Sequence, residues 1–232
     1  MKEFLTKAEI NEYLLEINDR LRDMDKHGEI LMVGGAVLAT VFNARESTRD
    51  IDAFFKPTAE IRQIIEDIAN KHGLRKDWLN DGAKGFITPQ MNQDVYIELS
   101  NLSVYNVDAE SLLAMKLTSA RYMSKDLPDS VFLMKALDIK NIDQLYDIVE
   151  KYTHKNQQTV ESDFFIKRAF EKYQKDLEAE ITEPSLQNDT SNSKKQDKTQ
   201  NGTFSDRLKA STEKAHEQNA KALPINKLDK NS

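Results

Sequence analysis

The sequence predicts a mixed α/β (α+β) fold, in which a small mixed β-sheet flanked by helices precedes a helical C-terminal part and a disordered tail. In residues 1–107, short apolar runs typical of strands alternate with amphipathic segments typical of helices. In residues 108–180 the apolar residues recur at helical spacing only. Residues 181–232 are polar and nearly lack aromatic and β-branched apolar residues. We therefore expect an α/β core over 1–107, a helical subdomain packed on it over 108–180, and a disordered polar tail over 181–232.

The core elements follow from apolar spacing and from cap residues. An amphipathic helix is predicted within residues 4–26, where Thr6 and Glu9 form a capping-box pattern. Residues 43–49 are polar, so we expect a loop there, and the glycine-punctuated residues 77–86 are expected to form an irregular loop or a helical turn. The remaining predicted elements are a strand at 29–33, a helix at 36–42, a strand at 51–55, a helix at 58–72, and strands at 94–99 and 102–107.

The helical part contains four predicted helices. Asp108 or Ser111 is the expected N-cap of the first, because a short polar side chain there can accept a hydrogen bond from a backbone N–H of the first turn. Beyond the last helix, the tail cannot bury enough apolar surface to offset the entropy of ordering it. The predicted helices span residues 108–122, 128–137, 141–152 and 162–177.

Charge and composition narrow the class of protein. The formal net charge is −6. Residues 181–232 hold 9 of the 33 Lys and Arg and 7 of the 39 Asp and Glu, which leaves 24 basic and 32 acidic residues in the rest. A body with a net charge of −8 argues against general nucleic-acid coating, although a local basic patch remains compatible with it.

Cysteine and hydropathy give three further expectations. The chain has no cysteine, which excludes disulfides, thiolate metal sites and cysteine nucleophiles and fits a reducing cytoplasm. The first ten residues lack the apolar segment of a signal peptide. Because no run approaches the ~20 apolar residues needed to span a bilayer, we expect no membrane association.

One stretch carries a pattern of site chemistry. Val33-Gly34-Gly35 ends a predicted strand and opens a predicted helix, and Asp50-Ile51-Asp52 lies on the next strand. Residues i and i+2 of a strand face the same side, so Asp50 and Asp52 project together. Two adjacent carboxylates favour a bound cation, and a glycine turn before a helix exposes backbone N–H groups to a phosphate. A metal site beside a phosphate site is typical of enzymes that transfer phosphoryl or nucleotidyl groups.

Each half of this pattern also has a simpler explanation. Gly34-Gly35 alone could be a tight turn that needs a positive φ. The two acids could be balanced by Arg45 or Arg49 without any metal. We favour the metal interpretation because the glycine pair and the acid pair occur together, at a distance that one short helix can bridge.

These residues resemble the signature of the DNA polymerase β-like nucleotidyltransferase superfamily. The run Arg45-x-Ser47-Thr48-x-Asp50-Ile51-Asp52 looks like that of a bacterial group related to the toxins of toxin–antitoxin and abortive-infection systems. That group also has a Trp-Leu-Asn segment and a Leu-Leu-Ala-Met-Lys-Leu helix, matched here by residues 78–80 and 112–117. The likeness covers residues 31–152. Fourteen residues separate Gly35 from Asp50, slightly more than is usual in the superfamily, and this leaves the roles of Arg45 and Arg49 open.

The resemblance implies roles for the acids and the glycines. Asp50 and Asp52 would bind one or two Mg²⁺ ions, and Gly34 and Gly35 would hold the triphosphate of a nucleoside triphosphate. The superfamily needs a third acid on a neighbouring strand, where Glu98 fits better than Asp94 because it lies between two apolar residues. Either acid could reach the metals, since they differ by four positions and face the same side of a strand.

The resemblance also implies a basic helix and contacts to phosphate. Lys116 would neutralise phosphate charge together with Arg121, although a lysine on an apolar helix can also snorkel at the edge of the core. Asp126 or Asp129 would position Lys116 or an acceptor hydroxyl. Ser47 and Thr48 would contact phosphate or act as turn residues, and Arg45 would contact the nucleotide. The catalytic set would be Asp50, Asp52, Glu98 and Lys116, and the nucleotide-binding set Gly34, Gly35, Arg45, Ser47, Thr48, Arg121 and Asp126.

Two hypotheses of function follow. The first is a Mg²⁺-dependent nucleotidyltransferase that transfers a nucleoside monophosphate from a nucleoside triphosphate to a hydroxyl of a tRNA 3′ end, a protein or a small molecule. Such an enzyme could be the toxin of a toxin–antitoxin pair, with an antitoxin protein as its partner. The second is a catalytically inactive binding module on the same fold.

Overall fold

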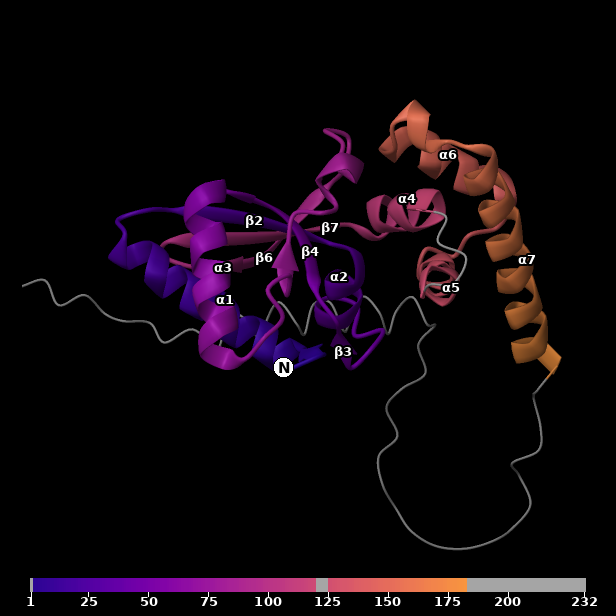
Figure 1. Cartoon of the computed structure of the whole chain (residues 1–232). Helices are drawn as coiled ribbons and strands as arrows, with labels where there is room; N and C mark the ends of the chain where they lie inside the picture. The colour runs from indigo at the N-terminus through magenta and orange to yellow at the C-terminus, as the bar shows by residue number, and fades with distance from the viewer. Residues whose placement is uncertain (1, 120–124, 183–232) are drawn as a thin grey trace, which may run out of the picture. The chain divides into compact units, whose positions relative to one another are not determined.

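A computed structural model describes residues 2–119 and 125–182 of the chain (Figure 1). The described residues form two compact units. The first comprises residues 2–84 and 93–106, and the second comprises residues 85–92, 107–119 and 125–182. Arg121 and nearly all of the predicted tail lie outside the described residues.

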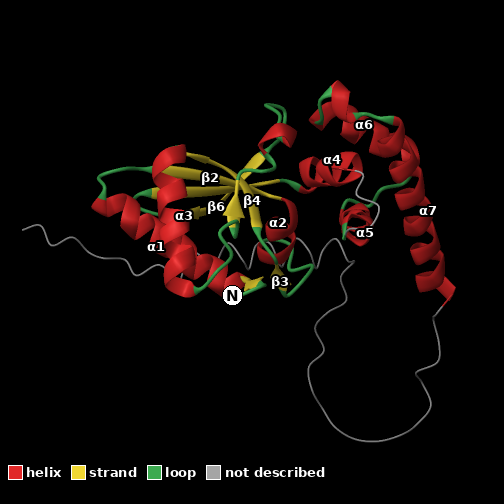
Figure 2. Ribbon diagram, in the orientation of Figure 1, coloured by secondary structure: helices red, strands yellow, loops and turns green. Residues whose placement is uncertain are grey.

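The first unit is built on a five-stranded mixed sheet, drawn in yellow in Figure 2, and this confirms the predicted mixed α/β class. The central strand β2 pairs antiparallel with β4 and parallel with β7, and β4 pairs parallel with β5. Strand β6 is the other edge and follows β7 in the sheet order. In order across the sheet, the strands are β5 (Leu79–Asn80), β4 (Ile51–Lys56), β2 (Gly28–Val33), β7 (Leu102–Val107) and β6 (Gln93–Glu98).

Helices α1 (Lys7–Asp23) and α3 (Thr58–His72) lie side by side across one face of this sheet (Figure 1). The predicted capping box is confirmed, because Glu9 N–H donates to Thr6 Oγ1 while Thr6 N–H donates to the Glu9 carboxylate. The apolar stripes of both helices are buried, as are the sheet residues that alternate on the same side. These buried residues are Ile10, Leu14, Ile17, Leu21, Ile61, Ile64, Ile68, Ile30, Met32, Ile51, Ala53 and Phe55.

Two segments that were expected to be irregular contain short strands. Within 43–49, β3 (Ser47–Thr48) pairs antiparallel with β1 (Leu5–Thr6). Within 77–86, β5 adds to the edge of the main sheet, and Lys84–Phe86 forms a single turn of 3₁₀ helix, so a helical turn is also present as one of the two predicted alternatives. Strands of two residues are too short to show a periodic pattern, so only pairing with a distant strand defines them. The short helix α2 (Gly34–Thr40) links β2 to the first of these segments.

The second unit is helical among the residues described. Asp108 caps α4 (Ala109–Ser119), because its Oδ1 accepts a hydrogen bond from Ser111 N–H at 2.8 Å. Residues 85–92 join this unit through Thr88, whose hydroxyl donates to the Tyr152 carbonyl oxygen. None of the described helices is long and apolar enough to cross a membrane. The remaining helices are α5 (Asp126–Ala136), α6 (Ile142–Tyr152) and α7 (Val160–Thr182).

Candidate functional site

The predicted acid pair lies at the start of β4, which is the second strand from the β5 edge of the sheet. Asp52 is directly opposite Val33, the last residue of β2, and Asp50 immediately precedes the strand. Both side chains are partly buried. Among the residues that the structure describes, neither carboxylate has a hydrogen-bond or ion-pair partner. The pair is therefore a concentration of negative charge without a counter-ion from its immediate neighbours.

The charge environment raises the pKa of the Asp50 carboxyl above its ordinary value. Burial is the main cause, because it disfavours the ionised form, and the negative charges of Asp52 and Asp77 add to it. The guanidinium groups of Arg75 and Arg49 act in the opposite direction but do not outweigh these effects. A divalent cation beside Asp50 would favour the ionised carboxylate.

Gly34 lies directly against Asp52. Its φ of +66° is in the left-handed region, which favours glycine. A Cβ at this position would also approach Asp52 Oδ2 to 2.9 Å. The chain thus needs glycine here both for the turn after β2 and to leave space for the Asp52 carboxylate.

Gly35 leaves space for a second set of side chains from the loop before β4. A Cβ on Gly35 would lie 3.0 Å from Thr48 Oγ1 and 3.3 Å from Arg45 Nη1. The Thr48 hydroxyl donates to the Asp50 carbonyl oxygen at 3.1 Å, which links this loop to the acid pair. Ser47 is the neighbour of Thr48 in β3 and pairs with Thr6 of β1. The structure therefore brings Arg45 and Thr48 to the glycine turn.

Glu98, the preferred third acid, is not brought to this site. Its carboxylate accepts a hydrogen bond from the Ser103 hydroxyl at 2.7 Å, and Ser103 pairs with Glu29 on β2. Glu29 and Val33 are four residues apart, so Glu98 lies about 13 Å along the strand direction from the row that contains Asp52. One metal cannot be shared over that distance, and the placement argues against Glu98 as a ligand.

The alternative acid, Asp94, lies at the start of β6, which is the end nearer to the row of Asp52. Leu99 N–H donates to the Leu102 carbonyl oxygen at 2.9 Å, which closes a tight hairpin between β6 and β7. Because β7 runs parallel to β2, the start of β6 lies at the end of the sheet where β2 stops at Val33. The apolar flanks that favoured Glu98 in the sequence carry no information about this register.

Lys116 belongs to an ion cluster within the second unit. Its Nζ lies 2.6 Å from Asp126 Oδ1 and 3.0 Å from Asp129 Oδ2, and all three side chains are at most 14% exposed. The Ser119 hydroxyl donates to the second oxygen of Asp126 at 3.0 Å. The predicted contact of Lys116 with Asp126 and Asp129 is therefore present, and the lysine charge is already compensated. Arg121, its predicted companion, lies outside the described residues.

Sequence reasoning missed the contribution of β5 to the site. Asn80 lies directly opposite Asp52 in the β4–β5 pairing, and Ile51 N–H donates to the Trp78 carbonyl oxygen at 2.7 Å. The negative charge of Asp77 and the positive charge of Arg75 both act on Asp50. The Trp-Leu-Asn resemblance was the one available signal, since it singled out this segment without assigning a role to it.

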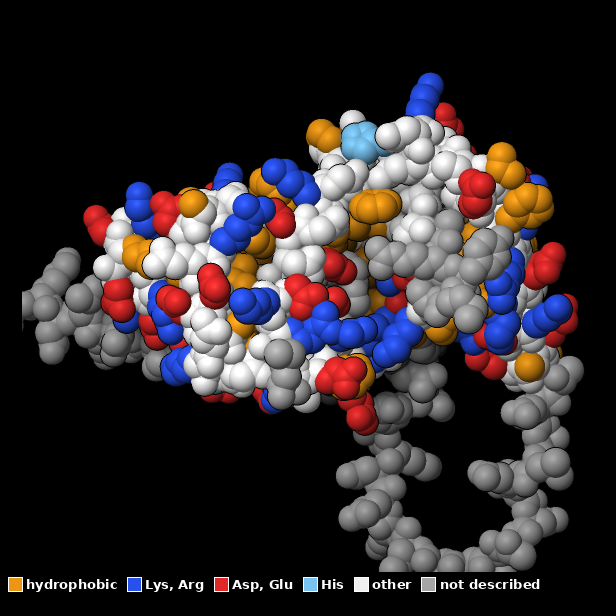
Figure 3. All heavy atoms as spheres, in the orientation of Figure 1, with side chains coloured by type: hydrophobic (Ala, Val, Ile, Leu, Met, Phe, Trp, Pro, Cys, Tyr) orange, Lys and Arg blue, Asp and Glu red, His pale blue; other side chains and the backbone are white. Residues whose placement is uncertain are grey.

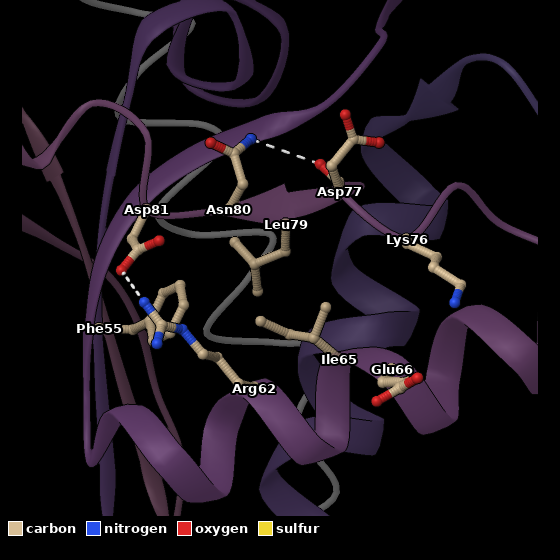
Figure 4. A pocket seen from close by; sticks show the side chains of 9 residues that line it. All are labelled: Phe55, Arg62, Ile65, Glu66, Lys76, Asp77, Leu79, Asn80 and Asp81. Atoms are coloured by element: carbon tan, nitrogen blue, oxygen red, sulfur yellow. Dashed lines mark hydrogen bonds and ion pairs between the residues drawn. The ribbon is translucent and has the colours of Figure 1, made fainter.

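A cavity of about 350 Å³ lies along β5, next to this segment (Figure 4). Its inner wall is apolar, with Leu79 of β5 pointing toward Ile65 of α3, whereas Asn80 points to the opposite side of the strand. At its mouth, Arg62 and Asp81 form an ion pair at 2.6 Å. The remaining lining residues are Phe55, Glu66, Lys76 and Asp77.

The side chains at the site fit a magnesium ion that takes its other ligands from a substrate. Among the described residues, no group of three or more His, Asp or Glu side chains is arranged to hold a metal by itself. Mg²⁺ commonly binds to one or two carboxylates and completes its octahedron with phosphate oxygens and water. The uncompensated carboxylates of Asp50 and Asp52 meet that requirement.

The mixed sheet, the glycine turn and the acid pair are compatible with a nucleotidyltransferase-type domain, and a family model supports that class. The chain belongs to the family described as nucleotidyltransferase of unknown function (DUF6036), whose model matches residues 12–178. No curated protein and no solved structure matches the chain significantly. The predicted nucleotidyltransferase superfamily is thereby confirmed, and the family description suggests a transferase.

Proposed function

We propose that this protein transfers a nucleoside monophosphate from a nucleoside triphosphate to an acceptor hydroxyl, in a reaction that depends on Mg²⁺. The observation that carries the proposal is the uncompensated pair Asp50 and Asp52, held against the left-handed turn at Gly34. A structural role would be served better by a neutral or ion-paired residue at Asp50, because its charged form is disfavoured there.

The residues at the site divide the work of the reaction. Asp50 and Asp52 would hold the cation, which supplies charge neutralisation and lowers the pKa of the acceptor hydroxyl. Gly34 leaves room for the Asp52 carboxylate, and Arg45, whose guanidinium lies close to Gly35, would donate to phosphate oxygens. The acceptor oxygen attacks the α-phosphorus in line and pyrophosphate leaves, so no side-chain nucleophile is needed.

The acceptor stays open among an RNA 3′ end, a protein hydroxyl and a small molecule. Acidic and basic side chains are interspersed over the described residues on the face in Figure 3, without a broad basic surface of the kind that binds long nucleic acids. This distribution is compatible with a short contact to an RNA end. A toxin with a protein antitoxin remains the proposed biological setting, on the resemblance of the Arg45–Asp52 run.

An inactive binding module is the alternative, and the site does not favour it. A domain that only binds a partner has no need of two carboxylates without a counter-ion next to an obligatory glycine. Loss of either acid would relieve repulsion and stabilise such a module, as the raised pKa of Asp50 indicates.

Labelling distinguishes the two functions. The full chain is incubated with each of the four α-labelled nucleoside triphosphates, Mg²⁺, and either total RNA, cell lysate or buffer. We expect transfer of label by the wild type, loss of transfer in Asp50→Asn/Asp52→Asn, and no loss in the matched control Glu98→Gln. If the wild type transfers label to none of the acceptors, or if the double variant keeps full activity, the proposed transferase activity is contradicted.

Expression in cells tests the toxin separately. Growth arrest by the wild type that the double variant relieves supports a toxin. If the purified protein transfers label but its expression leaves growth normal, the toxin hypothesis is contradicted and the transferase hypothesis stands.

A further inference from the structure

An arginine–aspartate pair precedes β5 and lies beside the acid pair. Ile51 pairs with Leu79, and Ile51 N–H donates to the Trp78 carbonyl oxygen at 2.7 Å. Because Asp50 precedes Ile51, the chain before Trp78 runs next to Asp50. That chain carries Arg75 and Asp77.

The pair has the geometry of a bidentate salt bridge. Arg75 Nε lies 2.9 Å from Asp77 Oδ1, and Nη2 lies 2.6 Å from Oδ2. These two bonds use two of the five guanidinium N–H groups, and three remain for another acceptor. Among the described residues, Asp77 is the only ion-pair partner of Arg75, whose side chain is 25% exposed. Arg75 thus has a fixed orientation together with unused donors.

We propose that Arg75 binds the triphosphate of the nucleotide and that Asp77 is the positioning residue that orients its guanidinium. The proposal rests on the proposed transferase and adds a phosphate-binding residue to it. Asp50 and Asp52 would repel a polyanion, and Arg75, whose charge acts on Asp50, would reduce this repulsion together with Arg45 and the bound cation. A planar guanidinium suits phosphate better than an ammonium group does, because it donates two parallel hydrogen bonds.

The backbone on both sides of the site is tied to the N-terminal residues. Lys2 N–H donates to the Gly73 carbonyl oxygen at 2.9 Å and Lys2 forms a bridge with Leu74, directly before Arg75. A few residues later, β1 pairs with the strand that contains Thr48. These N-terminal residues lie outside the region that the family model matches. They hold Arg75 and Thr48 at their places beside Asp50.

Binding measurements test the proposal on the full chain in Mg²⁺. The variants are Arg75→Gln, Arg75→Lys and Asp77→Asn, and the probes are the nucleoside triphosphate used in transfer and inorganic tripolyphosphate as its competitor. The matched control is Arg62→Gln, because Arg62 also pairs with an aspartate, Asp81, but at the mouth of the cavity (Figure 4).

We expect Arg75→Gln to raise the dissociation constant for both probes about 10- to 100-fold, the range for a lost charge-assisted hydrogen bond. KM should rise with it while kcat changes little, since the guanidinium is expected to bind the ground state and the transition state alike. Arg75→Lys should recover part of the loss and Asp77→Asn should show a smaller loss. Arg62→Gln should stay within about twofold.

Two results overturn the inference. The first is a lowered thermal midpoint in Arg75→Gln with unchanged dissociation constants, which makes the pair purely structural. The second is a wild type that transfers label but does not bind tripolyphosphate. Failure of the transferase itself is recognised separately, because then the wild type transfers nothing or the Asp50→Asn/Asp52→Asn variant keeps its activity.

Discussion

The acid pair of the first unit and the cluster of Lys116, Asp126 and Asp129 in the second unit differ in how their negative charge is compensated. Among the described residues, Asp50 and Asp52 have no ion-pair partner, and the pKa of Asp50 is raised by burial and by the charges of Asp52 and Asp77. Asp126 and Asp129 instead share the ammonium group of Lys116 at 2.6 and 3.0 Å. Both groups are acidic and at least partly buried, so burial alone does not identify a functional site. The proposed site is the group whose negative charge has no ion-pair partner among the described residues.

The same contrast exists within the first unit. Glu16 of α1 is also shielded from solvent, and burial alone would raise its pKa. Hydrogen bonds from His72, Arg20 and Lys71 outweigh that effect and lower the pKa of Glu16 to about 2. Glu16 therefore joins α1 to α3, whereas the pKa of Asp50 is shifted the other way, which is the pattern of a candidate functional carboxylate.

Removal of the acid pair should have the largest effect. Asp50→Asn/Asp52→Asn is expected to reduce the transfer rate at least about 10³-fold, because a bound metal supplies several kcal/mol of transition-state stabilisation. The thermal midpoint should stay equal or rise, because the raised pKa of Asp50 means that its charged form destabilises the fold at neutral pH. Transfer assays measure the change in rate, and thermal unfolding measures the change in the thermal midpoint. A large loss of stability would mean that the acids serve the fold.

Removal of the shared lysine should have the opposite effect on stability. Lys116→Met leaves Asp126 and Asp129 without the ammonium group and is expected to lower the free energy of unfolding by about 3 kcal/mol. Urea unfolding measures the change. Lys116→Met/Asp126→Asn/Asp129→Asn should recover most of it, because no buried charge is then uncompensated. Failure of the triple variant to recover would show that Lys116 stabilises through packing.

A comparison of Gly34 with Gly73 separates two effects of a side chain at Gly34: the cost of a left-handed backbone and the steric contact with Asp52. Gly34 and Gly73 have φ values of +66° and +65°, but a Cβ on Gly73 would meet nothing within 4 Å. Gly73→Ala should therefore cost about 1 kcal/mol, from the left-handed backbone alone. Gly34→Ala should cost about 2 kcal/mol and also reduce transfer at least tenfold, since its Cβ would displace the Asp52 carboxylate. Equal transfer rates in the two variants would contradict this account.

The pH dependence of stability should show the smallest effect. A carboxyl whose folded pKa is depressed stabilises the protein above its unfolded pKa, and this stability is lost as the pH falls through the folded value. For Glu16 the loss is expected between pH 4.5 and about 2. Glu16→Gln should lower the free energy of unfolding at pH 7 by about 1 kcal/mol and reduce the slope of stability in that acid range. An unchanged slope would contradict the assigned partners.

The sequence by itself determined the elements that depend on local pattern. Apolar spacing predicted the long helices α1, α3, α6 and α7, and the capping box at Thr6 predicted where α1 begins, since both are properties of neighbouring residues. The alternation of Asp50 and Asp52 around the buried Ile51 predicted an acid pair on one face of a strand. Gly34-Gly35 marked the turn beside it.

Only the tertiary structure decided which distant residues meet at the acid pair. Strand register placed Asn80 opposite Asp52 and Glu98 on a different row, and register depends on pairing between segments that are far apart in the chain. The same pairing brought Arg75 and Asp77 beside Asp50. Compensation of charge, which separates Asp50 from Asp126, is likewise a property of spatial neighbours, and a single sequence does not encode it in any local pattern.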